Sequence, residues 1–170
     1  MQESMAKVRF APSPTGVPHI GNTRTALFNF LFARHNKGKF ILRIEDTDKE
    51  RFLPESEKAI FEILNWLELN FDGKYVRQSE RLSIYKEHAE MLKEKELTYE
   101  DNGAIRFKMP KEGATFWTDE IGEKKISFDN KTQDDFVIFK SVGFPTYNFA
   151  NVIDVHLMDI PLVIRGEECI

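Results

Sequence analysis

The residues best suited to chemistry lie in the turn Pro12–Asn22, which follows a predicted strand and precedes a predicted helix. Open α/β sheets bind ligands at such turns, and helix N-termini offer unpaired N–H groups and partial positive charge to phosphates. Gly16 and Gly21 allow a ligand close to the backbone, and His19 stands beside them. The turn contains neither G-x-G-x-x-G nor G-x-x-x-x-G-K-[ST]. We interpret His19 as a phosphate contact; the alternative is a histidine packed against the neighbouring prolines.

A second group of chemically capable residues is acidic and comprises Glu45, Asp46 and Asp48. Three close carboxylates can bind Mg²⁺. They are also common where a helix begins, because the helix dipole favours negative charge there. We favour the second interpretation and expect no metal site in this chain.

A β–loop–α–β unit must position both groups. Apolar spacing predicts a strand at Lys7–Ala11, a helix at Ile20–Asn36 and a buried strand at Lys39–Ile44, with Gly38 as the C′ residue that ends the helix. Strands joined through a helix are parallel. The buried face of the helix is expected to include Ala26, Leu27, Phe30, Leu31 and Phe32.

The remaining chain predicts two further helices and then a change to β structure. Pro54 is expected to open one helix and Ser79 to cap the next. Short β-rich pieces follow between 104 and 140, at 105–109, 125–128 and 136–140. A helix near 149–158 and a strand at Leu162–Arg165 then return to α/β character. The pattern predicts a parallel sheet with a small, mainly antiparallel inserted lobe.

Composition excludes several classes of protein. The 170 residues are 41% hydrophobic and 31% charged, and no apolar run approaches the roughly 20 residues that span a membrane. The N-terminus does not resemble a secretory signal, so a cytoplasmic protein with no membrane partner is expected. The single cysteine, Cys169, rules out an internal disulfide and a multi-cysteine zinc cluster.

Positive charge is concentrated near the N-terminus, although the net charge is −4. The segment Ser4–Ile44 has no Asp or Glu but carries Lys7, Arg9, Arg24, Arg34, Lys37, Lys39 and Arg43. Such segregation fits a bound polyanion. It also fits a solvated helix face, and charge alone does not choose between the two.

Five ordered blocks of the sequence are similar to glutamyl-tRNA synthetases, which are class I aminoacyl-tRNA synthetases. The blocks are RFAPSPTG with HIGN at 9–22, LRIEDTD at 42–48, RQSER at 77–81, FPTYNFAN at 144–151 and VIRGEE at 163–168. The resemblance implies a partial Rossmann-like, doubly wound sheet. It also implies ATP-dependent activation of L-glutamate to glutamyl-adenylate, followed by transfer to tRNA(Glu).

The resemblance assigns the ATP site to His19, Gly21, Asn22 and Glu168, with His19 and Asn22 as the catalytic pair. His19 matches the first histidine of the class I motif and would stabilise charge on the α-phosphate. Asn22 stands where that motif has a second histidine. ATP would bring its own Mg²⁺ as a substrate complex, and no zinc is expected in this chain.

The resemblance also implies the residues that bind glutamate. Arg9 and Tyr147 would hold the side-chain carboxylate, with Asn151 and Arg165 completing carboxylate recognition. The ammonium group would lie against Ser13, Glu45 and the Ala11 backbone. Taken singly, Arg9 also fits a surface charge at a strand end, Tyr147 a core aromatic residue and Glu45 a helix-start charge.

The sequence departs from the family pattern in its length and motifs. We predict that residues 1–97 are the first half of the catalytic domain, 98–140 a shortened acceptor-end insertion and 141–170 the return to the catalytic domain. The motif Lys-Met-Ser-Lys-Ser is absent, and Lys108-Met109-Pro110-Lys111 is not its equivalent, because it precedes Tyr147. A monomeric, incomplete catalytic fragment, inactive by itself, is therefore expected.

Three alternatives to the ligase remain open. One is a non-catalytic module that holds glutamate or an acceptor end. The second is a relative of glutaminyl-tRNA synthetase, although the LRIEDTD block fits the glutamyl form better. The third is a truncated relative that glutamylates a modified base, for which zinc-binding cysteines and a different spacing are expected.

Overall fold

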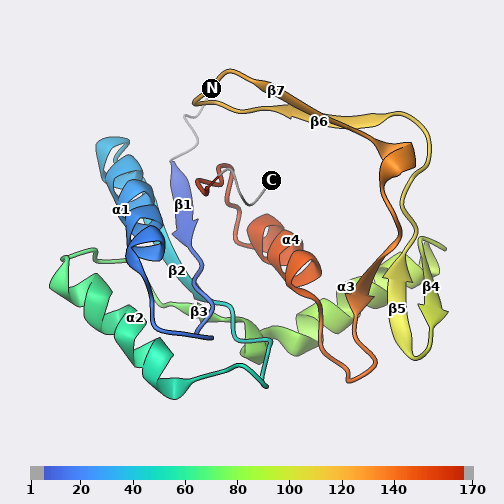
Figure 1. Cartoon of the computed structure of the whole chain (residues 1–170), viewed down its shortest axis with the longest axis horizontal. Helices are drawn as coiled ribbons and strands as arrows, with labels where there is room; N and C mark the ends of the chain where they lie inside the picture. Colours follow the sequence, from blue (N-terminus) through green and yellow to red (C-terminus); the bar gives the residue numbers. More distant parts are fainter. Residues whose placement is uncertain (1–5, 167–170) are drawn as a thin grey trace. The chain divides into compact units, whose positions relative to one another are not determined.

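The computed structural model describes residues 6–166, which form two compact units (Figure 1). The first unit combines the N-terminal part of the chain up to Ser83 with the segment from Ala150 onward, and the second is Ile84–Phe149. Within the described residues, no helix combines the length and apolar character needed to cross a membrane.

The first unit is built on a parallel three-stranded sheet with the order β1-β2-β3. Its elements are β1 (Lys7–Phe10), α1 (Ile20–His35), β2 (Lys39–Ile44), α2 (Pro54–Trp66) and β3 (Val76–Arg77). The predicted strands, their parallel pairing and the role of Pro54 at the start of α2 are confirmed. Val8 of β1 pairs with Phe40 of β2, and both are fully buried. Such continuous apolar runs are typical of parallel strands that are covered on both faces.

Gly38 is required for a different reason from the one predicted. Lys37, with a φ of 51°, takes the left-handed conformation after α1. A Cβ on Gly38 would lie 1.9 Å from the carbonyl oxygen of Ala6, which accepts a hydrogen bond from the Lys39 N–H at 2.7 Å. The glycine is therefore needed for close backbone approach rather than for a positive φ.

The buried face of α1 is also narrower than predicted. Ala26, Asn29 and Ala33 are buried, whereas Leu27 and Leu31 are 37% and 52% exposed. Ala26 and Ala33, which are two turns apart, have side chains small enough to let the helix approach the sheet closely. The larger aliphatic side chains consequently lie outside the contact.

The second unit is mainly antiparallel, as predicted. Its strands are β4 (Thr98–Asp101), β5 (Ala104–Phe107), β6 (Ala114–Thr118), β7 (Lys125–Asp129) and β8 (Phe136–Phe139), and they form a sheet β4-β5-β8 and a hairpin β6-β7. The turn between β4 and β5 is Asn102-Gly103, with φ values of 50° and 79°, which matches a two-residue hairpin.

This unit extends beyond the predicted insertion of 98–140 because it begins inside α3 (Leu82–Glu94). A cavity of about 250 Å³ lies between α3 and the sheet, lined by Ala89, Ile105 and Phe139 among others. The helix thus packs with the antiparallel strands. The assignment of 98–140 to an acceptor-end insertion stays a prediction.

The segment after α4 (Tyr147–Leu157) corrects one predicted element, because Leu162–Arg165 does not form a strand. The carbonyl oxygen of Ile164 accepts from side chains, at 3.1 Å from Asn29 Nδ2 and 3.5 Å from Arg9 Nη1. Side-chain donors take the place of a neighbouring strand at this carbonyl.

Candidate functional site

The turn after β1 is fastened to the chain that follows β2. The Glu45 N–H donates to the Pro12 carbonyl at 3.0 Å, and the Leu53 N–H donates to the Pro14 carbonyl at 2.9 Å. The Ser13 hydroxyl donates to the Glu45 carbonyl at 2.9 Å. These three bonds hold the predicted phosphate turn beside the predicted acidic cluster.

His19 and Asn22 form a capping box at the start of α1. The Gly21 N–H donates to His19 Nδ1 at 3.0 Å, and the His19 N–H donates to Asn22 Oδ1 at 3.1 Å. Because Nδ1 accepts a hydrogen bond, the neutral imidazole carries its proton on Nε2. His19 therefore presents an N–H donor on the side of the ring away from the helix.

The predicted glycines differ in their surroundings. A Cβ on Gly21 would lie 2.8 Å from His19 Cε1, so the imidazole ring would have to move from this position if Gly21 carried a side chain. A Cβ on Gly16 would meet no atom within 4 Å. The space over Gly16 is open and can receive a ligand.

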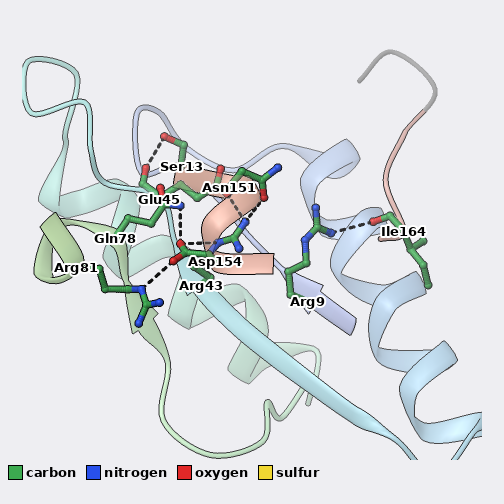
Figure 2. A network of polar contacts seen from close by, with 9 residues as sticks. All are labelled: Arg9, Ser13, Arg43, Glu45, Gln78, Arg81, Asn151, Asp154 and Ile164. Atoms are coloured by element: carbon green, nitrogen blue, oxygen red, sulfur yellow. Dashed lines mark hydrogen bonds and ion pairs between the residues drawn. The ribbon is translucent and has the colours of Figure 1, made fainter. Parts of the chain in front are cut away.

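A buried polar network connects β2 with α4 (Figure 2). Arg43 Nη2 donates to Glu45 Oε1 at 2.7 Å and to Asn151 Oδ1 at 2.5 Å. Asp154 Oδ2 lies 3.7 Å from Arg43 Nε and accepts from Gln78 Nε2 at 2.9 Å. Two of the predicted glutamate-binding residues, Glu45 and Asn151, thus meet at one guanidinium group.

Glu45 is 7% exposed, and burial raises the pKa of its carboxyl above the ordinary value for Glu. The Arg43 and Arg9 guanidinium groups act in the opposite direction, whereas the Asp154 carboxylate adds to the increase in pKa. Arg9, itself 5% exposed, lowers the Glu45 pKa less than Arg43 does. The two arginine charges, which lower the pKa, therefore act against burial, which raises it, at the Glu45 carboxylate.

Asn151 and Arg165 also meet at one surface. They line a cavity of about 530 Å³ together with residues of the α4 segment 152–156 and of 159–163. The cavity therefore brings a third predicted residue, Arg165, to the side of α4 where Asn151 lies.

The other predicted site residues lie as follows. Ala11 comes directly after β1, and Ser13 is exposed in the turn. Tyr147 is the first residue of α4, is 46% exposed and belongs to the second compact unit, so its role beside Arg9 stays a prediction. Glu168 lies outside the described residues.

Ser79 does not cap a helix, contrary to the prediction. Its N–H donates to Asp46 Oδ1 at 2.8 Å and its hydroxyl donates to Asp46 Oδ2 at 2.6 Å. The residue lies in a 3₁₀ turn, Gln78–Arg81, and α3 begins only at Leu82. The Asp46 carboxylate, which follows β2 and is 33 residues away in sequence, supplies the acceptor oxygens for Ser79.

The acidic cluster is occupied by protein donors. Asp46 also receives Arg77 Nη1 at 3.3 Å, and Asp48 pairs with Arg51 at 2.7 Å. Within residues 6–166, no group of three or more His, Cys, Asp or Glu side chains is arranged to hold a metal ion.

Sequence reasoning missed Arg43, Gln78 and Asp154 as parts of the site. Arg43 and Asp154 are 0% exposed. A charged residue inside the apolar strand KFILRI was the available signal, because Arg is rarely buried without partners.

Comparison with known proteins identifies the family. The family model described as "tRNA synthetases class I (E and Q), catalytic domain" matches residues 5–104 and 93–170. The chain is 44% identical to a glutamate–tRNA ligase of Dehalococcoides mccartyi, over 95% of this chain and 42% of the relative. It is 45% identical to glutamate–tRNA ligase 2 of Fervidobacterium nodosum, over 95% of this chain and 41% of that protein.

Solved structures agree with this assignment. A glutamate–tRNA ligase from Elizabethkingia meningosepticum, in complex with its amino acid, matches with a TM-score of 0.89 and 37% identity, over 97% of this chain and 44% of that chain. A putative arginyl-tRNA synthetase from Campylobacter jejuni, at a TM-score of 0.56 and 18% identity over 98% of this chain and 49% of that one, shows the fold alone.

The chain spans less than half the length of these curated relatives. Its alignment with the D. mccartyi protein covers 207 positions, more than the 170 residues of the chain, so that relative contains residues with no counterpart here. With the family model matched along both the parallel and antiparallel parts, the chain belongs to the family of class I tRNA synthetase catalytic domains for glutamate and glutamine.

Proposed function

We propose that this chain forms the glutamate- and ATP-binding part of a glutamate–tRNA ligase. In the proposed reaction a carboxylate oxygen of L-glutamate attacks the α-phosphorus of ATP, and the bond to pyrophosphate breaks. The resulting glutamyl-adenylate then passes its glutamyl group to the 3′-terminal ribose of tRNA(Glu), releasing AMP. Mg²⁺ arrives with ATP as part of the substrate.

One observation carries the proposal. Glu45 after β2 and Asn151 from α4 meet at the buried Arg43 guanidinium, although Asn151 follows Glu45 by more than 100 residues, and the charge of Arg9 from β1 acts on the same Glu45 carboxylate. These side chains offer both signs of charge, as an amino acid with an ammonium and two carboxylate groups requires. This arrangement occurs in a chain that is 44% identical to a glutamate–tRNA ligase.

The glutamate ligand is assigned by charge. The Glu45 carboxylate takes the ammonium group, and the Ser13 hydroxyl, whose proton is already donated to the Glu45 carbonyl, can accept a further ammonium N–H. Arg9 and Arg165 supply guanidinium forks for the carboxylates, with Asn151 as a neutral partner.

The ATP ligand is assigned to the N-terminus of α1. The first turn of α1 contains no acidic residue, so the N–H groups of this turn that the cap does not use meet phosphate without a competing negative charge. His19 donates from Nε2 to the α-phosphate, and Asn22 holds His19 in place through the capping box. In-line adenylation depends on this kind of positioning and charge stabilisation rather than on covalent catalysis.

Calorimetric binding of a non-hydrolysable glutamyl-adenylate analogue tests the proposal. The chain is expected to bind one equivalent, with affinity strongly reduced by Arg9→Ala and less reduced by His19→Ala. The glutaminyl-adenylate analogue serves as the comparison ligand and is expected to bind more weakly. Binding that is unaffected by Arg9→Ala, or tighter binding of the glutaminyl analogue, would contradict the assignment.

A further inference from the structure

Arg43 is the residue of β2 that the packing of a parallel strand does not explain. Its side chain is 0% exposed, within a strand whose other buried residues, Phe40, Ile41, Leu42 and Ile44, are apolar. A charged side chain withdrawn from water is strongly destabilising unless partners satisfy it. Its partners therefore indicate what it does.

The guanidinium head is held on its far side by a fixed carboxylate. Asp154 Oδ2 lies 3.7 Å from Arg43 Nε. Asp154 is itself 0% exposed and accepts from Gln78 Nε2 at 2.9 Å and from Arg81 Nε at 2.8 Å. With Asp154 anchored by two donors, its carboxylate presents a fixed negative charge to the Arg43 guanidinium group (Figure 2).

On the other side of the guanidinium group, Arg43 Nη2 determines which atoms of Glu45 and Asn151 face a ligand. Arg43 Nη2 donates to Glu45 Oε1, which leaves Oε2 as the oxygen that accepts from a ligand ammonium group. The same nitrogen donates to Asn151 Oδ1, so the NH₂ group of the Asn151 amide is directed away from Arg43. Without the guanidinium, the Asn151 amide could turn by 180° and present an acceptor instead of a donor.

We propose that Arg43 is a positioning residue that sets the hydrogen-bond polarity of the amino-acid site. It makes Glu45 an acceptor for the ligand ammonium and Asn151 a donor to a ligand carboxylate. The inference rests on the proposed function, because it deepens the role of the same site. Arg43 acts through these two side chains and needs no contact with the ligand itself.

Charge gives this role a second consequence. The groups that act on the Glu45 carboxylate are Arg43, two residues before it on β2, Arg9 of β1 and Asp154 of α4. Burial raises the Glu45 pKa, and Arg43 is the largest influence that lowers it. Removing the Arg43 charge is therefore expected to raise this pKa further and to leave more Glu45 protonated near neutral pH.

The test compares Arg43→Gln with Arg81→Gln in this chain. Both changes remove an arginine that contacts Asp154, but Arg81 bonds to Asp154 Oδ1 at 2.8 Å and, among the described residues, does not bond to Glu45 or Asn151. Arg43→Gln is expected to weaken the glutamyl-adenylate analogue by about tenfold or more, because a charge-assisted bond is lost at two ligand-binding groups. Arg81→Gln is expected to weaken it by less than about threefold, and Arg43→Lys should restore part of the loss.

Two readouts separate positioning from general structural damage. A desamino analogue without the ammonium group should lose less affinity in Arg43→Gln than the parent ligand, because it does not use Glu45. The affinity of the parent ligand should fall with decreasing pH, with a midpoint at higher pH in Arg43→Gln than in the unmodified chain. A loss that is equal for both ligands and independent of pH overturns the inference.

Carboxyl NMR of Glu45 in the ligand-free chain separates this inference from the proposed function. A higher Glu45 pKa in Arg43→Gln, with no such change in Arg81→Gln, supports the charge coupling without any ligand. An unchanged Glu45 pKa overturns it. If the unmodified chain binds neither analogue, the proposed function and the positioning role built on it both fail, while the NMR result still reports on the coupling.

Discussion

Replacing Glu45 by Gln is expected to stabilise the folded chain at neutral pH while removing the proposed ammonium contact. The side chain is 7% exposed, and burial dominates its electrostatics, because its pKa is raised despite the 2.7 Å contact with Arg43. Glutamine has nearly the same shape, and its carbonyl oxygen can accept the Arg43 bond. The substitution therefore removes a buried charge and keeps the hydrogen bond.

The magnitude follows from two opposing contributions. Glu45→Gln replaces a hydrogen bond between two charged groups by one in which only Arg43 is charged, and since a bond to a charged group is worth about 1.5–3 kcal/mol, we take roughly 1 kcal/mol as the loss. Burial of a carboxylate costs several kcal/mol even after relaxation. We expect Glu45→Gln to be more stable than the unmodified chain by about 1–2 kcal/mol at pH 8.

The sign of the pH dependence is set by the raised pKa. A carboxyl group whose folded pKa lies above its unfolded pKa binds its proton more tightly in the folded state. The contribution of the Glu45 carboxyl group to the free energy of unfolding is therefore fully present below its unfolded pKa and is lost as pH rises through its folded pKa. The stability difference between the two proteins should therefore be small near pH 4 and should grow toward pH 8.

Urea unfolding between pH 4 and pH 8, followed by circular dichroism, measures this difference. Glu62→Gln is the matched control, because Glu62 is 63% exposed and pairs with Lys58 across one helical turn. It is expected to change stability by less than about 0.5 kcal/mol. A Glu45→Gln protein that is less stable at pH 8, with the deficit shrinking toward pH 4, would show that ion pairing outweighs burial and would refute the reasoning.

Two further substitutions test the geometry of the site. Gly21→Ala places a Cβ 2.8 Å from His19 Cε1, so the affinity for the adenylate analogue, measured by calorimetry, should fall by about threefold or more. Gly16→Ala adds a Cβ with no atom within 4 Å and should leave the melting temperature unchanged. An unchanged affinity in Gly21→Ala, or a changed melting temperature in Gly16→Ala, would contradict these expectations. Asp46→Ala removes the acceptor of both Ser79 bonds and should lower the free energy of unfolding in urea by about 2–4 kcal/mol. A change under about 0.5 kcal/mol would show that other contacts hold the 3₁₀ turn.

Several elements could be predicted because their causes are local. The apolar runs at Lys7–Phe10 and Lys39–Ile44 indicated buried strands, and Pro54 indicated a helix start. The predictions that failed depended on distant partners. Ser79 was expected to cap a helix, yet its N–H and its hydroxyl both donate to Asp46, 33 residues earlier in the chain. Leu162–Arg165 was expected to form a strand, but its Ile164 carbonyl bonds to side chains.

The candidate site shows the same division. Family resemblance named Arg9, Glu45 and Asn151 one at a time. It did not reveal Arg43 as the common partner of Glu45 and Asn151, because a bond across 108 positions of sequence leaves no periodic signal. The capping of His19 was a local feature that the sequence could have indicated through Asn22 three residues later.

The sequence by itself determined the family, the order of strands and helices, and the residue types available to bind a charged amino acid and a phosphate. These follow from motifs and from spacings of two to four residues, which act within one element. Only the tertiary structure decided which buried polar groups meet and which atom each presents. That outcome depends on packing: Arg43, Glu45 and Asn151 are buried or half-buried, and a group withdrawn from water must find its partner wherever the fold brings one.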